Sequence, residues 1–394
     1  MHEVVCTKWY TRSGMHTAAE RMTAVMEERV TVMLNKKPAY DIVYGTGFEA
    51  LPSELDGMGI SSRRLCIVTD SNVRELYADI LKNLLCPHAK QVDVFSFPAG
   101  EAFKTLDTVR DLYAFLIAQH YDRKDLLVAL GGGVVGDVTG YAAATYLRGI
   151  DFIQVPTTLI AQSDSSIGGK TGVDFDGYKN MVGAFYMPRL VYMNIETLKT
   201  LDDRQFYSGF AEVMKHGLIR DALFYEWLLE HMYEIHERDT ETLKEMVMRS
   251  CAVKKLVVEK DPLEKGDRAL LNFGHTIGHA IEKYKNFELS HGESIALGFV
   301  AAAYISWKRG LLSMEEYYEI RDMLVPFNLP ISIDHIDPEQ IVALTKSDKK
   351  MEHGTIRFIL LKKIGKAMID TSVTEQEMLD AVREIYFDEE DERA

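Results

Sequence analysis

"DLLVALGGGVVGD", residues 125–137, is the stretch of sequence that decides the fold class. Its leading apolar run, 126–130, predicts a short strand that is buried on both faces of a sheet. Glycines follow the strand, and a helix is expected to begin among them. A strand that runs through a glycine turn into a helix is the building unit of a mostly parallel α/β sheet.

The same glycines raise the question of a nucleotide. Gly131, Gly133 and Gly136 fit the spacing G-x-G-x-x-G, in which glycine lets the backbone approach a phosphate at a helix N-terminus. Tight packing at a strand-to-helix turn gives the same pattern. No acid follows at the usual distance of about 20 residues, although Asp70 ends a strand upstream. The turn therefore favours nucleotide binding, with its parts in an unusual order.

The first half of the chain alternates strand and helix signals around this unit. Two strands of a hairpin are expected at 29–34 and 40–45, and further strands at 64–70, 91–97, 125–130 and 151–158. Helices are expected at 72–85 and in the segment that ends near residue 120. This alternation predicts a mostly parallel, Rossmann-like sheet with helices on both faces.

Strand signals fade after about residue 200, and helical periodicity replaces them. Helices are expected within 203–221, 223–237, 241–261, 273–284 and 291–310, with a late β-hairpin at 355–369. We expect a disordered N-terminal extension over 1–28, an α/β domain over 29–195 and an all-α domain over 196–394. A cleft between the two domains is the expected place for a site.

Composition excludes several classes of protein. A net charge of −15 argues against nucleic-acid or anionic-membrane partners, although a local basic cluster could still bind a small anion. The chain has no apolar run of the roughly 18 residues that a membrane span needs, and no secretory signal. Its four scattered cysteines indicate reduced thiols and a cytoplasmic location.

Residues 162–185, "QSDSSIGGKTGVDFDGYKNMVGAF", are dense in polar residues and glycine. Asp164, Lys170, Lys179 and Asn180 are suitable partners for a phosphate or an oxyanion. An ordinary polar surface loop would have a similar composition. A long loop inside a compact domain more often carries function, so a functional loop is the favoured interpretation.

The helical half offers candidate metal ligands. His275 and His279 share a helical face, which suits either a metal pair or two unrelated histidines. His291 is a third candidate, and Glu212 shares a face with Lys215, a spacing typical of a salt bridge. Further polar candidates nearby are Lys254, Arg268 and Asn272. These residues predict a metal in an anion-binding cleft without deciding which histidines bind it.

Six segments in order resemble the 3-dehydroquinate synthases over residues 30–385. They are "GGGVVGDVTGYAAATYLRG", "QVPTTLIAQSDSSIGGKTGV", "KNMVGAFYMP", "GFAEVMKHG", "LLNFGHTIGHAIE" and "HGESIALG". The resemblance implies that Glu212, His275 and His291 hold one divalent metal ion, zinc or cobalt. It implies that His279 lies on the substrate side, near the phosphate.

The resemblance also implies a cofactor site and a substrate site. The implied NAD site comprises Asp70, Asn72, Glu101, Lys104, Gly132, Gly133, Val134, Asp137, Thr157, Thr158, Lys170, Lys179, Thr197 and Thr200. The implied substrate site comprises Asp164, Lys170, Lys179, Asn180, Lys215, Lys254, Arg268, Asn272, His279 and one of Lys349 and Lys350. Arg148 matches an arginine that the family donates across a homodimer interface.

The family substrate, 3-deoxy-D-arabino-heptulosonate 7-phosphate, is a sugar acid with a carboxylate and a phosphate. The implied reaction, in the shikimate pathway, is transient oxidation by NAD, phosphate elimination, reduction and an intramolecular aldol closure. Two other enzymes compete with this interpretation: a different sugar phosphate cyclase and a metal-dependent polyol dehydrogenase. A decayed, non-enzymatic scaffold would lack a ligand, and every implied ligand is present.

Overall fold

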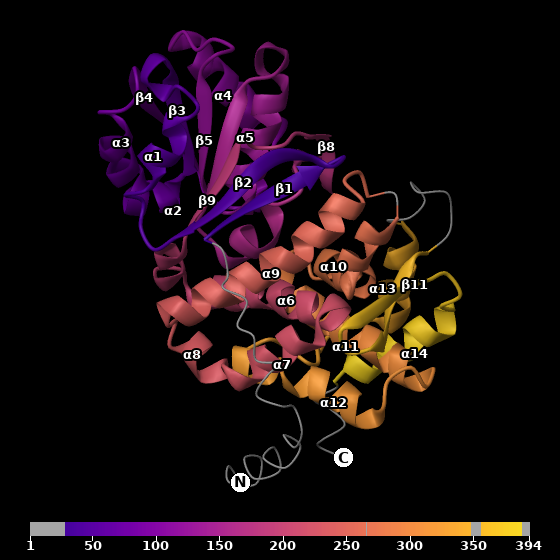
Figure 1. The fold of residues 1–394 in the computed structure, drawn as a ribbon. Coiled ribbons are helices and arrows are strands. Elements are labelled where there is room, and N and C mark those ends of the chain that lie inside the picture. The colour runs from indigo at the N-terminus through magenta and orange to yellow at the C-terminus, as the bar shows by residue number, and fades with distance from the viewer. Residues whose placement is uncertain (1–27, 265, 348–355, 388–394) are drawn as a thin grey trace, which may run out of the picture.

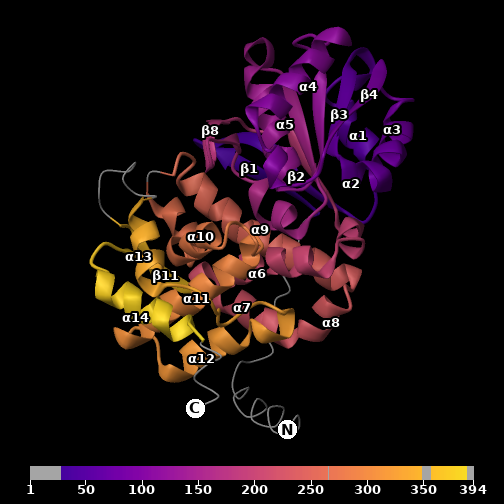
Figure 2. The same ribbon diagram turned by 180° about the vertical axis from the view of Figure 1, so that it is seen from behind.

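The computed structural model describes residues 28–264, 266–347 and 356–387. An α/β half and a helical half lie one above the other (Figure 1), and the view from behind shows the same two layers (Figure 2). The predicted extension over 1–28 lies outside the described residues except for Glu28. Within the described part of the chain, every helix is too short or too polar to cross a membrane.

A seven-stranded sheet forms the centre of the α/β half, and the predicted strands are confirmed. Its strands are β1 (Arg29–Leu34), β2 (Lys37–Gly45), β3 (Arg64–Asp70), β4 (Gln91–Phe97), β5 (Leu126–Gly131), β6 (Asp151–Pro156) and β9 (Leu190–Asn194). The order across the sheet is β1-β2-β9-β6-β5-β3-β4. β1 pairs antiparallel with β2, and all other pairs are parallel, so the predicted sheet type is confirmed.

Helices cover both faces of this sheet because its central strands are apolar on both sides. Leu126, Val128 and Leu130 pack on one face, whereas Leu127 and Ala129 pack on the other. The helices are α1 (Leu51–Asp56), α2 (Ser71–Val73), α3 (Asp79–Leu85), α4 (Leu106–Ala118) and α5 (Gly133–Thr145), with a π-helical turn at Arg74–Ala78 between α2 and α3. Alternate side chains of β5 therefore supply two separate cores.

The strand order places a crevice at the carboxyl ends of β3 and β5. The chain leaves β3 towards β4 at one edge and then returns to β5 on the other side of β3. Loops that leave neighbouring parallel strands in opposite directions open a crevice between them, which is where α/β sheets bind ligands. Asp70 ends β3 and Gly131 ends β5, so both residues border this crevice.

The polar stretch 162–185 is not the loop that its composition predicts. It contains a π-helical turn (Ala161–Ser165) and an antiparallel hairpin of β7 (Lys170–Phe175) and β8 (Tyr178–Phe185). Asp176 and Gly177 join the strands with φ of 50° and 80°. Two left-handed residues in a two-residue turn are typical of a type I′ hairpin, for which Asp-Gly is a strong sequence signal.

The second half is helical, as predicted, but it is not all-α. Its helices are α6 (Asp203–Arg220), α7 (Ala222–Glu230), α8 (Met232–His236), α9 (Thr240–Lys260), α10 (His275–Tyr284), α11 (His291–Lys308), α12 (Met314–Asp322), α13 (Pro338–Ser347) and α14 (Glu375–Ile385). A hairpin of β10 (Phe358–Lys363) and β11 (Lys366–Asp370) lies among them, at the place expected from the sequence. Short 3₁₀ helices occur at Ile60–Ser62, Glu101–Phe103, Tyr146–Arg148, Ile195–Lys199, Asp267–Asn272 and Val325–Phe327.

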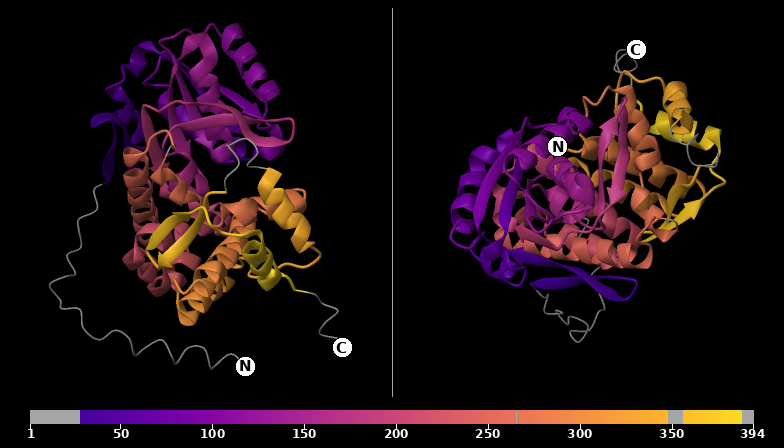
Figure 3. Two further views of the ribbon diagram at one scale, coloured as in Figure 1. Left: turned by 90° about the vertical axis from the view of Figure 1, so that its right-hand side faces the viewer. Right: turned by 90° about the horizontal axis from the view of Figure 1, so that it is seen from above.

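One hydrophobic core joins the two halves. Tyr40, Ile42 and Met193 of the sheet belong to the same buried cluster as Phe210 of α6 and Val300 of α11. The side view shows the α/β half above the helices (Figure 3). Because the halves share a core, the carboxyl ends of the strands and the starts of the helices are held together.

Candidate active site

Three side chains from three helices converge in the helical half. Glu212 comes from α6, whereas His275 and His291 are the first residues of α10 and α11. The Oε1 atom of Glu212 lies 3.3 Å from Nε2 of His291 and 3.5 Å from Nε2 of His275. Candidate ligand atoms of the three residues all lie within 4.8 Å of one another, so they could share one metal ion.

Two glycine contacts bring these helix starts together. A Cβ atom on Gly292 would lie 2.2 Å from the carbonyl oxygen of Ser208 in α6. A Cβ atom on Gly298 would lie 1.9 Å from the carbonyl oxygen of Gly274, which precedes α10. Only glycine tolerates such an approach. Helix α11 can therefore lie against both α6 and the start of α10, which places His291 beside the other two side chains.

His275 is oriented and neutral, as a metal ligand must be. Its Nδ1 lies 2.9 Å from the carbonyl oxygen of Phe273. A carbonyl oxygen only accepts, so Nδ1 carries the proton and the lone pair of Nε2 faces Glu212. Burial, reinforced by the nearby ammonium of Lys215, lowers the pKa of His275 well below its ordinary value. The imidazole is therefore unprotonated at neutral pH.

Glu212 and Lys215 form a buried ion pair on α6. Their side chains are 1% and 2% exposed. Burial alone would raise the pKa of Glu212, but the charge of Lys215 and the hydrogen bond with His291 hold it well below its ordinary value. Glu212 is thus an ionised carboxylate that combines one close cation with two imidazole nitrogens.

His279 belongs to a second possible grouping. Candidate ligand atoms of His279, Glu282 and His291 also lie within 4.8 Å of one another. In this group Glu282 already pairs with Lys179, whose Nζ lies 2.9 Å from Oε1. The Nδ1 of His291 lies 4.0 Å from the same oxygen, farther than its Nε2 lies from Glu212. The contacts around Glu212 are closer, so that grouping suits an ion better.

A second acid–base cluster lies beside the first. Nζ of Lys254 lies 2.6 Å from Oδ1 of Asp164, and His216 is 3.7 Å from the same oxygen. Burial lowers the pKa of Lys254 to about 8, although Asp164 opposes this effect. Burial would raise the pKa of Asp164, but Lys254 and Lys215 hold it well below its ordinary value.

Arg268 is a buried cation at the back of this cluster. Its side chain is among the largest that are almost fully buried, with 2% exposed. The guanidinium donates to the carbonyl oxygen of Pro262 at 2.7 Å and more weakly to that of Gly168. Its Nε has no hydrogen-bond partner among the described residues. The hydrogen bonds that the structure describes for this guanidinium go to carbonyl oxygens, which carry no formal charge, so its positive charge can still attract an anion.

Two further residues of the predicted substrate site, Lys170 and Asn272, are more exposed than Arg268. Lys170, at the start of β7, forms an ion pair with Glu264. Asn272 donates from Nδ2 to Oε1 of Glu264 at 3.5 Å, a long contact. Glu264 therefore holds one predicted substrate residue from each half of the molecule.

Ion pairs connect this region to the glycine turn. Lys179 lies 3.9 Å from Glu101, and Lys104 lies 3.9 Å from the same carboxylate oxygen. Lys104 also pairs with Asp137 in the first turns of α5 at 2.7 Å and donates to Asn180. Charged contacts thus run from the β7–β8 hairpin to the helix that begins at Gly133.

The glycine turn itself is tightly enclosed. A Cβ atom on Gly132 would lie 3.0 Å from Thr158, and one on Gly133 would lie 3.0 Å from Ser165. The Thr157 hydroxyl is buried and has no hydrogen-bond partner in the part of the chain that the structure describes. An unpartnered buried hydroxyl beside a glycine-capped helix start suits a polar ligand such as a dinucleotide phosphate.

Asp70 caps α2 with one of its oxygens. Oδ1 accepts from the backbone N–H groups of Asn72 and Val73 at 2.9 and 3.0 Å. Asn72, the second residue of α2, is exposed. This end of β3 therefore presents polar groups to the same crevice as the glycine turn.

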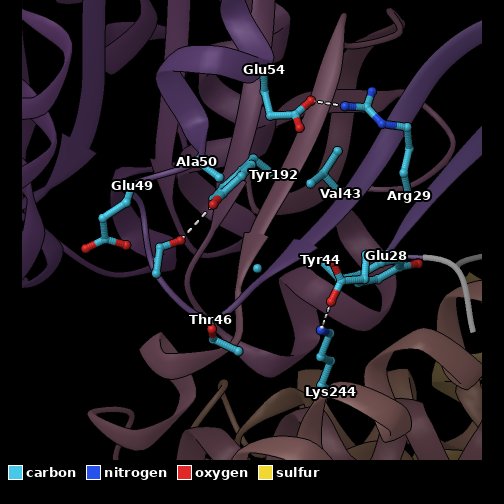
Figure 4. A pocket seen from close by; sticks show the side chains of 12 residues that line it. Glu28, Arg29, Val43, Tyr44, Thr46, Glu49, Ala50, Glu54, Tyr192 and Lys244 are labelled. Carbon is cyan, nitrogen blue, oxygen red and sulfur yellow. Dashed lines mark hydrogen bonds and ion pairs between the residues drawn. The ribbon is translucent and has the colours of Figure 1, made fainter.

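A separate pocket of about 450 Å³ lies at the carboxyl end of β2, between α1 and α9. Glu28, Arg29, Glu54, Tyr192 and Lys244 are among its lining residues (Figure 4). Arg29 pairs with Glu54, and Lys244 pairs with Glu28 at 2.6 Å. None of the predicted site residues that the structure describes lines this pocket, so it is distinct from the cluster around Glu212.

Family profiles match most of the described chain. The profile for the 3-dehydroquinate synthase N-terminal region matches residues 94–208, and that for the C-terminal region matches residues 209–351. The chain belongs to the 3-dehydroquinate synthase family. The family resemblance found in the sequence is thereby confirmed.

Curated 3-dehydroquinate synthases agree over nearly their whole length. The protein from Acetivibrio thermocellus is 42% identical over 87% of this chain and 95% of its own. That from Nitrosospira multiformis is 43% identical over 88% of this chain and 95% of its own.

Solved structures of sugar phosphate cyclases share the fold. The 2-epi-5-epi-valiolone synthase of Streptomyces hygroscopicus subsp. jinggangensis, solved with NAD⁺ and Zn²⁺, has a TM-score of 0.83 and 29% identity over 93% of this chain and all of its own. A 2-deoxy-scyllo-inosose synthase with carbaglucose-6-phosphate, NAD⁺ and Co²⁺ has a TM-score of 0.82 and 27% identity over 90% of this chain and 99% of its own. A butanol dehydrogenase of Thermotoga maritima, at 13% identity and a TM-score of 0.67, shares the fold alone.

A few predicted site residues of this 3-dehydroquinate synthase family member lie apart from the cluster. Arg148 is exposed after the far end of α5, away from the glycine turn. Thr197 is buried and accepts from Gln162, whereas Thr200 contacts Tyr77. Lys349 and Lys350 lie outside the described residues.

Three residues of the cluster had no place in the prediction from sequence. They are His216, Glu264 and Glu282. Glu282 follows His275 and His279 at helical spacing, so the face that the histidines share indicated it. His216 follows Lys215 directly, and the sequence carries no signal that its ring faces Asp164. Glu264 lies in an irregular segment where side-chain direction cannot be predicted from spacing.

Proposed function

We propose that this chain is a 3-dehydroquinate synthase that converts 3-deoxy-D-arabino-heptulosonate 7-phosphate into 3-dehydroquinate and phosphate. Family membership and the identity of curated relatives support this reaction. One structural observation carries the proposal further. A carboxylate and two imidazoles that suit one ion lie beside buried cations, and ion pairs lead from there to a glycine-capped helix.

The residues fit the two groups that such a reaction needs. Glu212, His275 and His291 would hold a zinc or cobalt ion, and three protein ligands leave positions open for substrate oxygens. The glycine turn, with the unpartnered hydroxyl of Thr157, would hold NAD⁺. When bound, the dinucleotide accepts and returns a hydride and the ion polarises the substrate oxygen.

The chain's own residues bind and orient a substrate with two anionic groups. Lys254 and Arg268 are almost fully buried, so a carboxylate or phosphate that reaches them meets little competition from water. Lys170, Lys179 and Asn272 border the same region at more exposed positions. The site contains charges of both signs, because the ionised Asp164 lies between cations. Such an arrangement fixes the orientation of the substrate as well as attracting it.

His279 and Asn180 complete the proposed substrate site. The His279 ring lies 5.1 Å from that of His275 and 5.9 Å from that of His291, between centroids. Asn180 accepts from Lys104, which also pairs with Asp137 of α5. His279 is thus a neighbour of the proposed metal ligands, and Asn180 is a neighbour of the proposed dinucleotide site, which supports a role for both residues in holding the substrate.

A coupled assay tests the reaction. Purified protein would be incubated with the sugar acid phosphate, catalytic NAD⁺ and zinc, and phosphate and NADH would be measured together. We expect phosphate release without accumulation of NADH, because the hydride is returned in the same cycle. Glu212→Gln should lose metal and turnover while it retains the wild-type circular dichroism spectrum. Steady NADH formation would indicate a dehydrogenase instead.

A different sugar phosphate cyclase is the second candidate, because the two cyclase structures named above share the fold closely. Sedoheptulose 7-phosphate and glucose 6-phosphate serve as parallel substrates in the same assay. Both lack the carboxylate of the sugar acid. Faster turnover of either sugar phosphate would favour this second candidate.

We also propose a homodimer in the cytoplasm. The exposed position of Arg148, remote from its own glycine turn, suits donation to a partner subunit. The free thiols of Cys66, Cys86 and Cys251 suit a reducing compartment. Mixing an inactive Arg148→Ala protein with an inactive Glu212→Gln protein should restore part of the activity if the arginine acts across the interface.

A further inference from the structure

Glu282 occupies a junction between the two halves of the molecule. It lies in α10 and its residue is 4% exposed. Its Oε1 accepts from Nζ of Lys179 at 2.9 Å and lies 4.0 Å from Nδ1 of His291. Lys179 belongs to the β7–β8 hairpin, which reaches over α10 from the α/β half (Figures 1 and 2). One buried carboxylate therefore touches a cation of one half and lies near a proposed metal ligand of the other.

Other contacts hold the tip of the hairpin against α10. Nζ of Lys179 lies 4.8 Å from the centre of the Phe287 ring, just beyond the helix. In the opposite direction, Nζ of Lys283 lies 5.5 Å from the centre of the Tyr178 ring. Each cation–aromatic contact of this kind contributes modestly at an exposed site. The Lys179–Glu282 hydrogen bond has a stronger directional preference than either of these cation–aromatic contacts.

The geometry favours a positioning role for Glu282 over metal binding. A buried carboxylate needs a partner, and Lys179 supplies one at hydrogen-bond distance. The alternative ligand Glu212 lies closer to His291 than Glu282 does and also approaches His275. With the ion held at Glu212, Glu282 remains available to hold Lys179 beside the histidines.

We propose that Glu282 is a positioning residue of the reaction, which fixes the Lys179 ammonium beside the metal-binding histidines by a partly buried ion pair between the halves. This inference rests on the proposed function. Lys179 would bind an anionic group of the substrate, and Glu282 would act only through Lys179. Removing the carboxylate should therefore displace the lysine without releasing the metal ion.

The test uses Glu282→Gln, Lys179→Met and the double variant in the metal-loaded protein. Glu282→Gln keeps the shape of the side chain and removes its charge. We expect it to lower kcat/KM for the sugar acid phosphate by about tenfold, as for other residues that orient a catalytic group. Lys179→Met should cost at least as much, and the double variant should cost hardly more than Lys179→Met. Zinc content should stay at the wild-type level in all three.

A second readout does not depend on turnover. Trace acetylation with acetic anhydride, followed by mass spectrometry, reports how accessible each lysine amine is. Loss of the ion pair should speed acetylation of Lys179 by about fivefold in Glu282→Gln. Glu288→Gln is the matched control, because Glu288 is an exposed glutamate shortly after the same helix. The control should leave both the kinetics and the acetylation of Lys179 unchanged.

Each outcome decides the matter. Loss of zinc in Glu282→Gln would make Glu282 a ligand and overturn the inference. Additive kinetic effects together with unchanged acetylation of Lys179 would overturn it as well. If the wild-type protein released no phosphate, the proposed function would fail, and acetylation alone would then decide whether Glu282 holds Lys179.

Discussion

Replacing Lys215 by methionine should destabilise the metal-free protein by about 3–5 kcal/mol. Lys215 and Glu212 are 2% and 1% exposed, so the substitution leaves a buried carboxylate without its closest cation. Methionine has a similar length and keeps most of the packing, so the cost comes mainly from charge. Lys254 is the next buried cation, but it is already paired with Asp164.

Zinc should reverse this loss. An ion held by Glu212, His275 and His291 brings two positive charges to the same carboxylate and replaces the missing ammonium. If it recovers all of the 3–5 kcal/mol, the variant must bind zinc roughly 10² to 10⁴ times more tightly than the wild type, at 1.4 kcal/mol for each tenfold change. Removing the metal would then affect the variant far more than the wild type.

Urea denaturation followed by circular dichroism, with excess zinc and with EDTA, measures both effects. Lys199→Met is the control, because Lys199 pairs with Glu196 at the same i,i+3 spacing but with side chains 42% and 37% exposed. That variant should change stability by about 0–1 kcal/mol, with or without zinc. A metal-free Lys215→Met protein as stable as the control, or a loss that zinc enlarges, would refute the reasoning.

Two further predictions concern pH and packing. Burial lowers the pKa of Lys254 to about 8, so its charge is lost as the pH rises through about 8 and KM for a substrate with two anionic groups should rise. Lys254→Arg stays charged and should show a flatter rise in KM from about pH 7 to about pH 9; parallel profiles for the two proteins would contradict the assignment. Gly298→Ala should cost about 3 kcal/mol or more, because its Cβ would overlap the Gly274 carbonyl oxygen. Thermal melts would show this against Gly57→Ala, where nothing lies within 4 Å of the added atom, and equal melting of the two variants would count against the close approach.

Much of the α/β half could be predicted because its strands are apolar on both faces. The strand that ends at Gly131 is buried along its whole length, and such runs are visible in sequence. The β7–β8 hairpin was missed because most of β8 is exposed and its residues do not alternate between apolar and polar. Asp176 and Gly177 carried the available signal, which the polar composition of the surrounding residues obscured.

The candidate site was less accessible to prediction from local pattern. Glu212 is separated from His275 and His291 by long stretches of chain, so helical spacing could relate His275 only to His279. The backbone contact of Gly292 with Ser208 brings the third residue in, and such approaches leave no periodic trace in sequence. Resemblance to a family supplied the grouping that spacing could not.

The core shared by the sheet and the helices limits how the enzyme can move. If the halves parted as rigid bodies, Tyr40, Ile42 and Met193 would lose their contacts with the helices and become exposed to water. Any closing motion must therefore keep this shared hydrophobic core intact. The edge of the sheet with β3 and β4 then has the greatest freedom to move. A chimera that exchanged the helical half with that of a relative would fail to fold unless the residues of the shared core were exchanged in both halves together.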